Sequence, residues 1–499
     1  MGTVPYSQKF ILAIDQGTTG TTVIIVDSRA RVLSKVTREF KQSFPKPGWV
    51  EHNPDDIWNS VLEGIAKAIQ DAKISASQIA AIGVTNQRET TLLWERKSGR
   101  AAYPAIVWQD RRTAPLCASL KKAGHEKLFH QKTGLFLDPY FSGTKIRWVL
   151  DHVSGALARA KKGELAFGTI DSFLLWKLTG GRVHKTDATN ASRTLLMKLK
   201  TLNWDEQLCS ILGVPMKILP EIVPNVGIFG RTQNIPNLSD GIPISGMAGD
   251  QQAALFGQGG TSLGDVKCTF GTGSFILLQT GETPVFSRSG NVTTLAFYWK
   301  NQASYALEGG AFICGAAVQW LRDGLKIIHS SSEIETLASS VSDNGGVQFV
   351  PALSGLGAPY WQPEVRGLLC GLTRGTERGH IARATLEGMA LQNVDILETM
   401  IKDLKRPMKE LRVDGGASSN DLLMQIQADY SGLRLYRPRI IETTALGAAF
   451  MAGLGIGFWK NLKEIKKIWK KEKEFIPTLS ARERKARIEA WRRTIWRAQ

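Results

Sequence analysis

The chain has 499 residues, of which 43% are hydrophobic, and its formal net charge is +18. It is too long to surround one hydrophobic core and too apolar to be a disordered chain, so we expect two large α/β domains. Its five cysteines are scattered and form no CxxC pair, which argues against a disulfide framework or a zinc site. Together with the lack of a secretory leader pattern before Phe10, they indicate a cytoplasmic protein with reduced thiols.

Half of the net charge lies in the last forty residues, where eight Lys and six Arg outnumber five Glu, so 14 minus 5 gives +9. A basic tail of this kind can bind nucleic acid or anionic lipid. Apolar residues recur in it at helical spacing, however, as Ile465 and Ile468 and again as Ile488, Trp491 and Ile495. We therefore favour helices that pack one face on a core, and we expect neither nucleic-acid binding nor membrane insertion.

Near the start of the chain, a Gly/Thr-rich turn at 15–22 separates two apolar runs, Phe10–Ile14 and Val23–Val26. This pattern predicts a β-hairpin whose tip exposes backbone N–H groups and short hydroxyls. Such a tip can close on phosphate oxygens, because glycine lets the backbone come near and threonine adds a donor without bulk. A second turn of this type, Phe270–Ser274, follows half a chain later. One such turn is usually an ordinary hairpin, whereas the pair indicates a phosphate clamp.

The other expected elements alternate along the chain. We expect helices at 54–73, 111–123, 311–325, 380–404 and 420–431, and strands at 79–85, 103–108, 266–269, 275–279 and 410–413. This alternation is typical of α/β domains, and its restart after Gly257–Gly260 suggests two similar ones. The uncharged stretch 443–459 is predicted to be a buried helix. A third glycine turn, Asp414–Asn420, opens a helix and suits either the adenosine side of a nucleotide or plain helix capping; beside two phosphate turns, we favour the nucleotide.

Polar groups and large aromatic residues stand together at the ends of two expected strands, in Thr85–Thr90 and Trp108–Arg112. Strand ends of α/β domains commonly line ligand crevices. Arg88 and Glu89 would supply donors and acceptors for neutral hydroxyls, and the face of Trp108 could cover a carbon backbone.

The segment Ser245–Ala254 follows an apolar run and precedes a helix, which places the carboxylate of Asp250 at a domain junction. Such an aspartate can be a simple helix cap. In phosphoryl transfer to an alcohol, one carboxylate must accept the hydroxyl proton, and Asp250 is placed to be that base. Asp15, at the first phosphate turn, is placed to hold Mg²⁺ through water.

Longer motifs give a more specific indication. The chain contains YFSGTKIRW at 140–148, GLLCGL at 367–372 continuing to His380 and Glu387, PKPGWVEH at 45–52, NQRET at 86–90 and GDQQ at 249–252. Through these motifs the chain resembles the glycerol kinases of the FGGY carbohydrate kinase family, from about Lys9 to Trp496. The resemblance implies an α/β fold of two actin/Hsp70-like ATPase (ribonuclease H-like) domains that flank a catalytic cleft. It also implies ATP-dependent phosphorylation of glycerol to sn-glycerol 3-phosphate, with Mg²⁺ as cofactor.

On this basis we expect an N-terminal kinase domain at 1–255, a C-terminal kinase domain at 256–455 and a basic helical tail at 456–499 packed on the second domain. The resemblance implies that glycerol is bound by Arg88, Glu89, Trp108, Tyr140, Asp250, Gln251 and Phe275. It also implies that the nucleotide is bound by Thr18, Thr19, Gly20, Thr272, Gly315, Gln319, Gly416 and Asn420. Asp250 is the expected base, Asp15 and Asp250 the expected metal ligands, and glycerol and ATP/ADP the partners of a homo-oligomer, either a dimer or a tetramer.

The chain departs from the family at two places. Many members carry Ser-Ser-Arg where this chain has Gly20-Thr21-Thr22. The threonine at 22 therefore either weakens one phosphate contact or is a plain strand residue. Some bacterial members bind fructose 1,6-bisphosphate at a Gly/Arg-rich loop, which here reads Asn237–Gly241 and contains no arginine.

Three alternative functions stay open at this point: a kinase for another polyol or sugar, an actin-like filament or chaperone ATPase, and a nucleic-acid binder attached through its tail. The pairing of Arg88 and Glu89 with Trp108 and Asp250 favours a small polyol over the switch ATPases. The tail is not accompanied by a nucleic-acid recognition motif.

Overall fold

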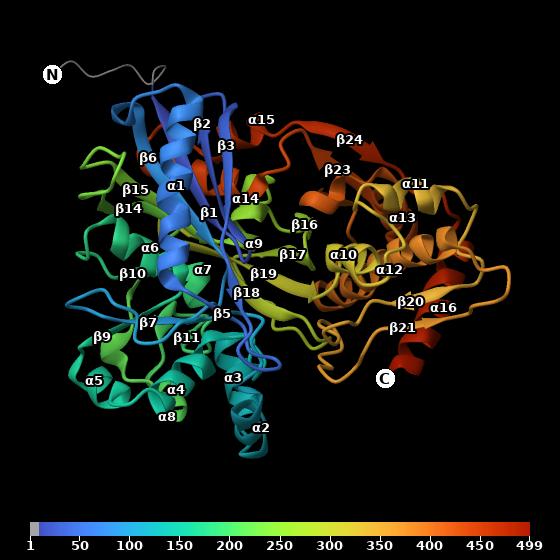
Figure 1. The fold of residues 1–499 in the computed structure, drawn as a ribbon, viewed down its shortest axis with the longest axis horizontal. Helices are drawn as coiled ribbons and strands as arrows, with labels where there is room; N and C mark the ends of the chain where they lie inside the picture. Colours follow the sequence, from blue (N-terminus) through green and yellow to red (C-terminus); the bar gives the residue numbers. More distant parts are fainter. Residues whose placement is uncertain (1–8) are drawn as a thin grey trace. The chain divides into compact units, whose positions relative to one another are not determined.

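The computed structural model describes residues 9–499. The chain divides into two compact units, drawn in Figure 1. Unit 1 holds residues 9–259 together with 293–305 and 443–468, and unit 2 holds 260–292, 306–442 and 469–499. Each unit is thus made of several separate stretches of the sequence. The expected domain boundaries after residues 255 and 455 remain a proposal. Both units are α/β, which confirms the expected fold class.

Unit 1 is built on a six-stranded sheet of order β14-β15-β6-β1-β2-β3. Its strands are β1 (Phe10–Gln16), β2 (Gly20–Val26), β3 (Val32–Glu39), β6 (Ile79–Asn86), β14 (Val226–Arg231) and β15 (Pro243–Gly249). Strands β1 and β2 form the expected antiparallel hairpin, whereas β6 pairs in parallel with both β1 and β15. The carboxyl ends of β1, β6 and β15 therefore meet at one edge of the sheet.

The helices that cover this sheet follow from local sequence signals. Helix α1 (Pro54–Ala72) begins at Asn53, whose side chain accepts a hydrogen bond from the Asp55 amide at 3.1 Å, and ends at Lys73 in the left-handed conformation. Helix α14 (Thr443–Gly455) is buried and contacts β6 and β15. A Cβ at Gly83 would lie 2.2 Å from the Ala448 carbonyl oxygen, so this helix packs closely because the strand lacks a side chain there.

Smaller elements complete unit 1. The helices are α2 (Ala114–Lys122), α3 (Glu126–Thr133), α4 (Ser142–His152), α5 (Ala156–Lys162), α6 (Ile170–Leu178), α7 (Ala188–Ala191), α8 (Glu206–Leu212), α9 (Asp250–Gly257) and α15 (Leu462–Ile468). The short strands are β4 (Gln42–Ser43), β5 (Glu51–His52), β7 (Leu92–Glu95), β8 (Ala105–Ile106), β9 (Leu165–Gly168), β10 (Lys185–Asp187), β11 (Met197–Lys198), β12 (Asn203–Trp204) and β13 (Glu221–Val223).

Unit 2 contains most of a seven-stranded sheet of order β18-β19-β17-β16-β22-β23-β24, whose first two strands include residues of unit 1. Its strands are β16 (Val266–Phe270), β17 (Ser274–Gly281), β18 (Val292–Trp299), β19 (Gln302–Ala311), β22 (Glu410–Asp414), β23 (Arg434–Pro438) and β24 (Lys471–Phe475). A two-stranded sheet, β20 (Gln348–Val350) with β21 (Leu368–Cys370), stands apart. The helices are α10 (Gly315–Asp323), α11 (Glu333–Ser339), α12 (Arg378–Leu404), α13 (Asp421–Ser431) and α16 (Ala481–Ala498).

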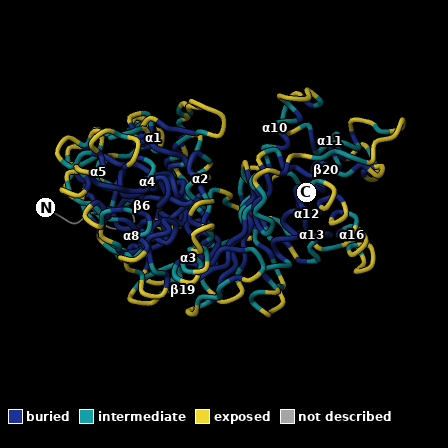
Figure 2. Tube along the Cα trace, turned by 90° about the horizontal axis from the view of Figure 1, so that it is seen from below, coloured by how far each residue is buried: buried dark blue, intermediate teal, exposed yellow. Residues whose placement is uncertain are grey.

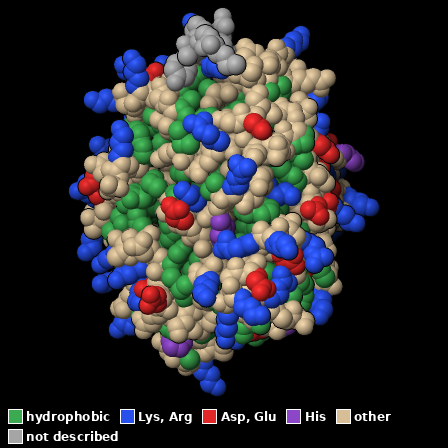
Figure 3. Space-filling model, turned by 90° about the vertical axis from the view of Figure 1, so that its left-hand side faces the viewer, with side chains coloured by type: hydrophobic (Ala, Val, Ile, Leu, Met, Phe, Trp, Pro, Cys, Tyr) green, Lys and Arg blue, Asp and Glu red, His purple; other side chains and the backbone are tan. Residues whose placement is uncertain are grey.

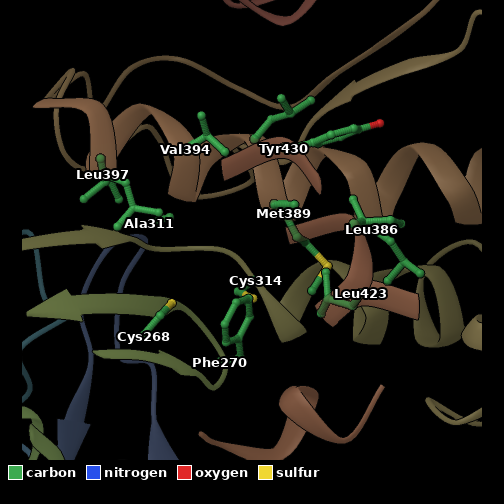
Figure 4. Close-up of a cluster of buried hydrophobic side chains, with 14 of the residues drawn as sticks. Cys268, Phe270, Ala311, Cys314, Leu386, Met389, Val394, Leu397, Leu423 and Tyr430 are labelled. Carbon is green, nitrogen blue, oxygen red and sulfur yellow. The ribbon is translucent and has the colours of Figure 1, made fainter. Parts of the chain in front are cut away.

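The core of unit 2 lies between this sheet and α12. Figure 4 shows Cys268 and Phe270 of β16 on the same side as Cys314, with Met389 of α12 and Leu423 of α13 beyond them. The outer helix α16 contributes Trp491 and Ile495 to the same core, on the face that the spacing of apolar residues predicts. Buried residues fill the interior of each unit, and exposed residues lie mainly in loops and on outer faces (Figure 2).

Several element boundaries differ from the sequence-based expectations. Only Ala105–Ile106 of the expected strand 103–108 is extended, and the helix expected at 311–325 begins at Gly315 because β19 runs to Ala311. The helix expected at 443–459 ends at Gly455. Strand β24, which is rich in alternating Lys and Glu, was not expected at all.

Figure 3 shows Lys and Arg side chains dispersed over one face and interspersed with Asp and Glu, without a single basic patch there. Among residues 9–499, none of the helices combines the length and the apolar content that a membrane crossing requires.

Candidate active site

Three strand ends bring expected site residues of unit 1 to one edge of its sheet. In the ladder, Asp15 pairs with Thr85 and Gly249 pairs with Asn86. Arg88 follows β6 by two residues, and Asp250 follows β15 directly as the first residue of α9. This parallel register is the reason why segments up to 235 residues apart in sequence meet at one place.

Arg88 and Asp250 are in direct contact. The Arg88 Nε lies 3.0 Å from Asp250 Oδ1, and its Nη1 donates to Gln252 Oε1 at 3.2 Å. The arginine side chain is buried, whereas the side chain of Asp250 is 29% exposed and can be reached by a ligand. A Cβ at position 249 would lie 2.5 Å from Arg88 Cδ, so Gly249 makes room for the arginine.

Asp15 and Asp250 form a pair of neighbouring carboxylates. Desolvation, together with the negative charge of Asp250, raises the pKa of Asp15 to about 7. No group of three or more His, Cys, Asp or Glu side chains suited to a metal is present in residues 9–499. Mg²⁺ in kinases is usually held by one or two carboxylates together with substrate phosphates, so this pair fits that ion.

Glu89 is fixed by a buried ion pair. Its Oε1 accepts from Arg193 Nε at 2.6 Å, and both side chains are almost fully buried. The backbone of Glu89 has a φ of 62°, a conformation that a non-glycine residue rarely adopts and that often marks a functional site. The Lys145 ammonium is a second buried cation near Glu89, and desolvation lowers its pKa to about 8. Glu89 is thus a hydrogen-bond acceptor whose charge is balanced from within unit 1.

Two aromatic side chains stand beside these polar groups. The rings of Trp108 and Tyr140 meet edge to face with centroids 5.7 Å apart. The Trp108 indole N–H donates to Thr18 Oγ1 at 2.9 Å, which links the expected polyol residue to the first Gly/Thr turn. The Arg193 guanidinium lies 5.6 Å from the centroid of the Tyr140 ring.

The first Gly/Thr turn is tight. The Gly17 amide donates to the Gly20 carbonyl at 2.9 Å, and a Cβ at Gly20 would lie 2.8 Å from the Arg38 carbonyl oxygen. The Thr19 carbonyl accepts from the Phe40 amide at 3.3 Å. The Thr22 hydroxyl lies 3.0 Å from that of Thr37 on β3, a contact that favours the plain strand interpretation of Thr22.

In unit 2, the second Gly/Thr turn joins β16 to β17 and packs on the start of α10. The Gly315 amide donates to the Gly271 carbonyl at 2.9 Å, and the Ala316 amide donates to the Thr272 carbonyl at 3.0 Å. Thr272 and Gly315 therefore lie together, and Gln319 is exposed on the next turn of the helix. Phe275 also belongs to unit 2, where its ring lies against Gly310.

The third glycine turn begins at Gly415, whose φ is 84°, and leads into α13. A Cβ at Gly416 would meet no atom within 4 Å, so the backbone is open there. The Asn420 side chain caps α13 by accepting from the Leu423 amide at 2.8 Å. Asn420 therefore has the capping role that was one of the two interpretations of this turn, and its role toward a nucleotide stays a prediction.

Within unit 1, the structure thus brings Asp15, Arg88 and Asp250 together and places Trp108 against both Tyr140 and Thr18. Gln251 is buried beside Asp250, whose Oδ1 accepts from the Gln251 amide at 2.7 Å. Arg193 was missed by sequence reasoning. No local signal marks it, because an arginine between Ser192 and Thr194 is equally suited to a surface segment.

Comparison with known proteins shows the family to which the chain belongs. The model of the FGGY family of carbohydrate kinases, N-terminal domain, matches residues 10–257, and that of the C-terminal domain matches residues 266–456. A glycerol kinase of Bdellovibrio bacteriovorus is 58% identical over 99% of this chain and 100% of its own length, and one of Trichlorobacter lovleyi is 55% identical over 98% and 99%. The crystal structure of Plasmodium falciparum glycerol kinase with ADP is 36% identical, covers 98% of both chains and superimposes with a TM-score of 0.90. The resemblance found in the sequence is confirmed: the chain belongs to the FGGY family of carbohydrate kinases.

Proposed function

We propose that this enzyme phosphorylates glycerol at the expense of ATP and releases sn-glycerol 3-phosphate and ADP, as a step of glycerol uptake and catabolism. The observation that carries the proposal is the contact between Arg88 and the partly exposed Asp250, with Glu89 and two aromatic rings nearby. The full-length similarity to glycerol kinases supports the same substrate.

In the proposed reaction, an oxygen of the terminal glycerol hydroxyl attacks the γ-phosphorus of ATP. The new P–O bond forms as the bond between the γ-phosphorus and the β,γ-bridging oxygen breaks, and ADP leaves with that oxygen. The hydroxyl proton passes to Asp250. Its contacts with Arg88 and with the Gln251 amide both use Oδ1, so Oδ2 is the oxygen that accepts the proton.

The other hydroxyls of glycerol would be held by Arg88 as donor and Glu89 as acceptor. A neutral triol needs both kinds of partner, and a buried polar group left without one costs about 1 to 3 kcal/mol. Trp108, Tyr140 and Phe275 would cover the carbon atoms, and Gln251 would add a further polar contact. These residue roles are proposals that the side-chain chemistry supports.

Asp15 and Asp250 would hold Mg²⁺. When bound, this ion offsets the negative charge of the phosphates in the transition state. The raised pKa of Asp15 supports this assignment, because its carboxylate is desolvated and lies near the negative charge of Asp250, and a bound cation would offset both effects.

The nucleotide would be held by the backbone and hydroxyl groups of the glycine turns. The proposed contacts are Thr18, Thr19, Gly20, Thr272, Gly315, Gln319, Gly416 and Asn420. The solved relative with ADP supports a nucleotide substrate. We also propose a cytoplasmic enzyme, which its five free cysteines support. The expected homo-oligomer stays a prediction.

The proposal is tested by ADP release against a panel of glycerol, other polyols and ketoses. We expect glycerol to give the highest kcat/KM. A higher kcat/KM for a larger sugar would assign that sugar as the substrate in place of glycerol. ATP turnover that no polyol stimulates would overturn the kinase assignment.

A further inference from the structure

A cluster of buried polar side chains lies behind the ends of β6 and β15. It consists of Asn86 at the end of β6, Asp187 at the end of β10, Thr189 and Asn190 in α7, and Asn225 just before β14, and we call it the Asp187 cluster. All five residues are fully buried. Burial of so many polar groups is costly unless they bind one another, so their partners indicate what the cluster does.

Asp187 is the centre of this cluster. Its Oδ1 accepts from the amides of Thr189 and Asn190 at 2.8 and 3.2 Å, from the Thr189 hydroxyl and from Asn225 Nδ2 at 3.0 Å. Its Oδ2 accepts from Asn190 Nδ2 at 2.6 Å. Five donors on one buried carboxylate fix the neighbouring side chains in a single arrangement.

The cluster reaches both strand ends that carry the candidate site. Asn190 exchanges two amide hydrogen bonds with Asn86, at 3.1 and 2.9 Å, two residues before Arg88. The Thr189 hydroxyl accepts from the Gly249 amide at 2.9 Å, one residue before Asp250. Asn225 Nδ2 also donates to the Met247 carbonyl at 2.8 Å, on the same strand as Gly249.

The contact with Gly249 has a specific consequence. Gly249 is the residue that precedes α9, and it has no side chain with which to fix the first turn of that helix. A side chain cannot be added there, because its Cβ would meet Arg88 Cδ at 2.5 Å. The Thr189 hydroxyl instead binds the N–H of Gly249 itself and so fixes the strand end from which Asp250 emerges.

We propose that Thr189, held by Asp187, is a positioning residue that sets the direction of the Asp250 carboxylate toward the acceptor hydroxyl. This inference rests on the proposed role of Asp250 as the base. A base must lie within hydrogen-bond reach of the proton that it removes, and a displacement of about 1 Å can cost about 10²-fold in rate.

The test compares Thr189→Val, which removes the hydroxyl and keeps the shape, with Thr189→Ser, which keeps the hydroxyl. The matched control is Thr133→Val. Thr133 is a buried threonine of unit 1 whose hydroxyl is likewise hydrogen-bonded, donating to the Phe129 carbonyl at 2.7 Å and accepting from the Leu135 amide at 3.1 Å. All variants and the wild type are assayed for kcat and KM with the polyol that the wild type prefers, and for thermal stability.

We expect Thr189→Val to lower kcat by about 10- to 100-fold with less than a threefold change in polyol KM, and Thr189→Ser to restore most of kcat. Thr133→Val should have the kcat of the wild type, although its loss of thermal stability should be comparable with that of Thr189→Val. In an Asp250→Asn background, Thr189→Val should lower kcat hardly further, because residues that act through one group are not additive. If Thr189→Val does not fold, Thr189→Ala removes the same hydroxyl and takes its place.

Provided that the wild type is active, three results would show the inference to be wrong. Thr189→Val could have the kcat of the wild type, Thr189→Ser could be as slow as Thr189→Val, or Thr133→Val could lose as much kcat as Thr189→Val. A wild type that phosphorylates no polyol would overturn the proposed function instead, and the inference would fall with it.

Discussion

The carboxylate of Asp250 shares its surroundings with one cation and one further carboxylate. Arg88 contacts Asp250 Oδ1 at 3.0 Å, and the negative charge of Asp250 helps to raise the pKa of Asp15. A group in such surroundings can be changed without disturbing a core, since Asp250 is itself 29% exposed. Substitution at this residue therefore separates chemistry from folding.

Asp250→Asn should lower kcat by about 10² to 10⁴-fold, because the amide keeps the shape of the side chain but cannot accept the proton. The melting temperature should change by only a few degrees. Steady-state kinetics together with a thermal melt measure both quantities. A kcat close to that of the wild type would exclude Asp250 as the base.

Arg193→Met should raise the glycerol KM and leave the ATP KM unchanged, since it leaves the buried Glu89 carboxylate without its main partner. Removing one member of a buried ion pair typically costs 3 to 5 kcal/mol, so we also expect a stability loss of about that size. Lys67→Met, which breaks an exposed pair with Asp71 on α1, is the control and should cost less than about 1 kcal/mol. A rise in the ATP KM alone would contradict the assignment of Glu89 to the polyol.

At the scale of elements, α16 is attached to α12 through a buried carboxylate. Asp395 Oδ2 accepts from the Trp491 indole N–H at 2.6 Å and from the Tyr360 hydroxyl at 2.9 Å. Burial raises the pKa of Asp395 from its ordinary value of 3.8 to about 6. Between about pH 4 and pH 6 the folded protein therefore binds more protons than the unfolded chain, so this residue makes stability fall as the pH rises through that window.

Asp395→Asn should abolish this part of the pH dependence while it preserves an oxygen acceptor for Trp491. The gap between 3.8 and about 6 corresponds to about 3 kcal/mol. Urea unfolding at pH 4 and pH 6.5 measures it, with Asp71→Asn as control because Asp71 is an exposed carboxylate that pairs with Lys67 at the surface of α1. An unchanged pH slope in Asp395→Asn would contradict the raised pKa of Asp395.

How much of these elements the sequence predicts depends on the source of their stability. The β1–β2 hairpin and α13 were predicted well, because apolar runs, glycines and an Asn cap are local signals. Strand β24 was missed because Lys471–Glu474 alternates in charge, and its extended form depends on pairing with β23. Arg193 was missed for a related reason: its burial depends on Glu89 and Tyr140, which are distant in sequence.

At the scale of the whole molecule, the residues that the proposed function uses are found in each of the two units. Arg88, Glu89 and Asp250 belong to unit 1, whereas Thr272 and Gly315 belong to unit 2. Each unit is assembled from separate stretches of chain, so the complete protein is required to test the activity.

The most direct test of the account follows the phosphorus atoms. The full-length protein is incubated with ATP, Mg²⁺ and glycerol, and the products are identified by ³¹P NMR. The account predicts sn-glycerol 3-phosphate and ADP in equal amounts, with neither formed when glycerol is left out. ADP accompanied by inorganic phosphate, at a rate that does not depend on glycerol, would contradict it.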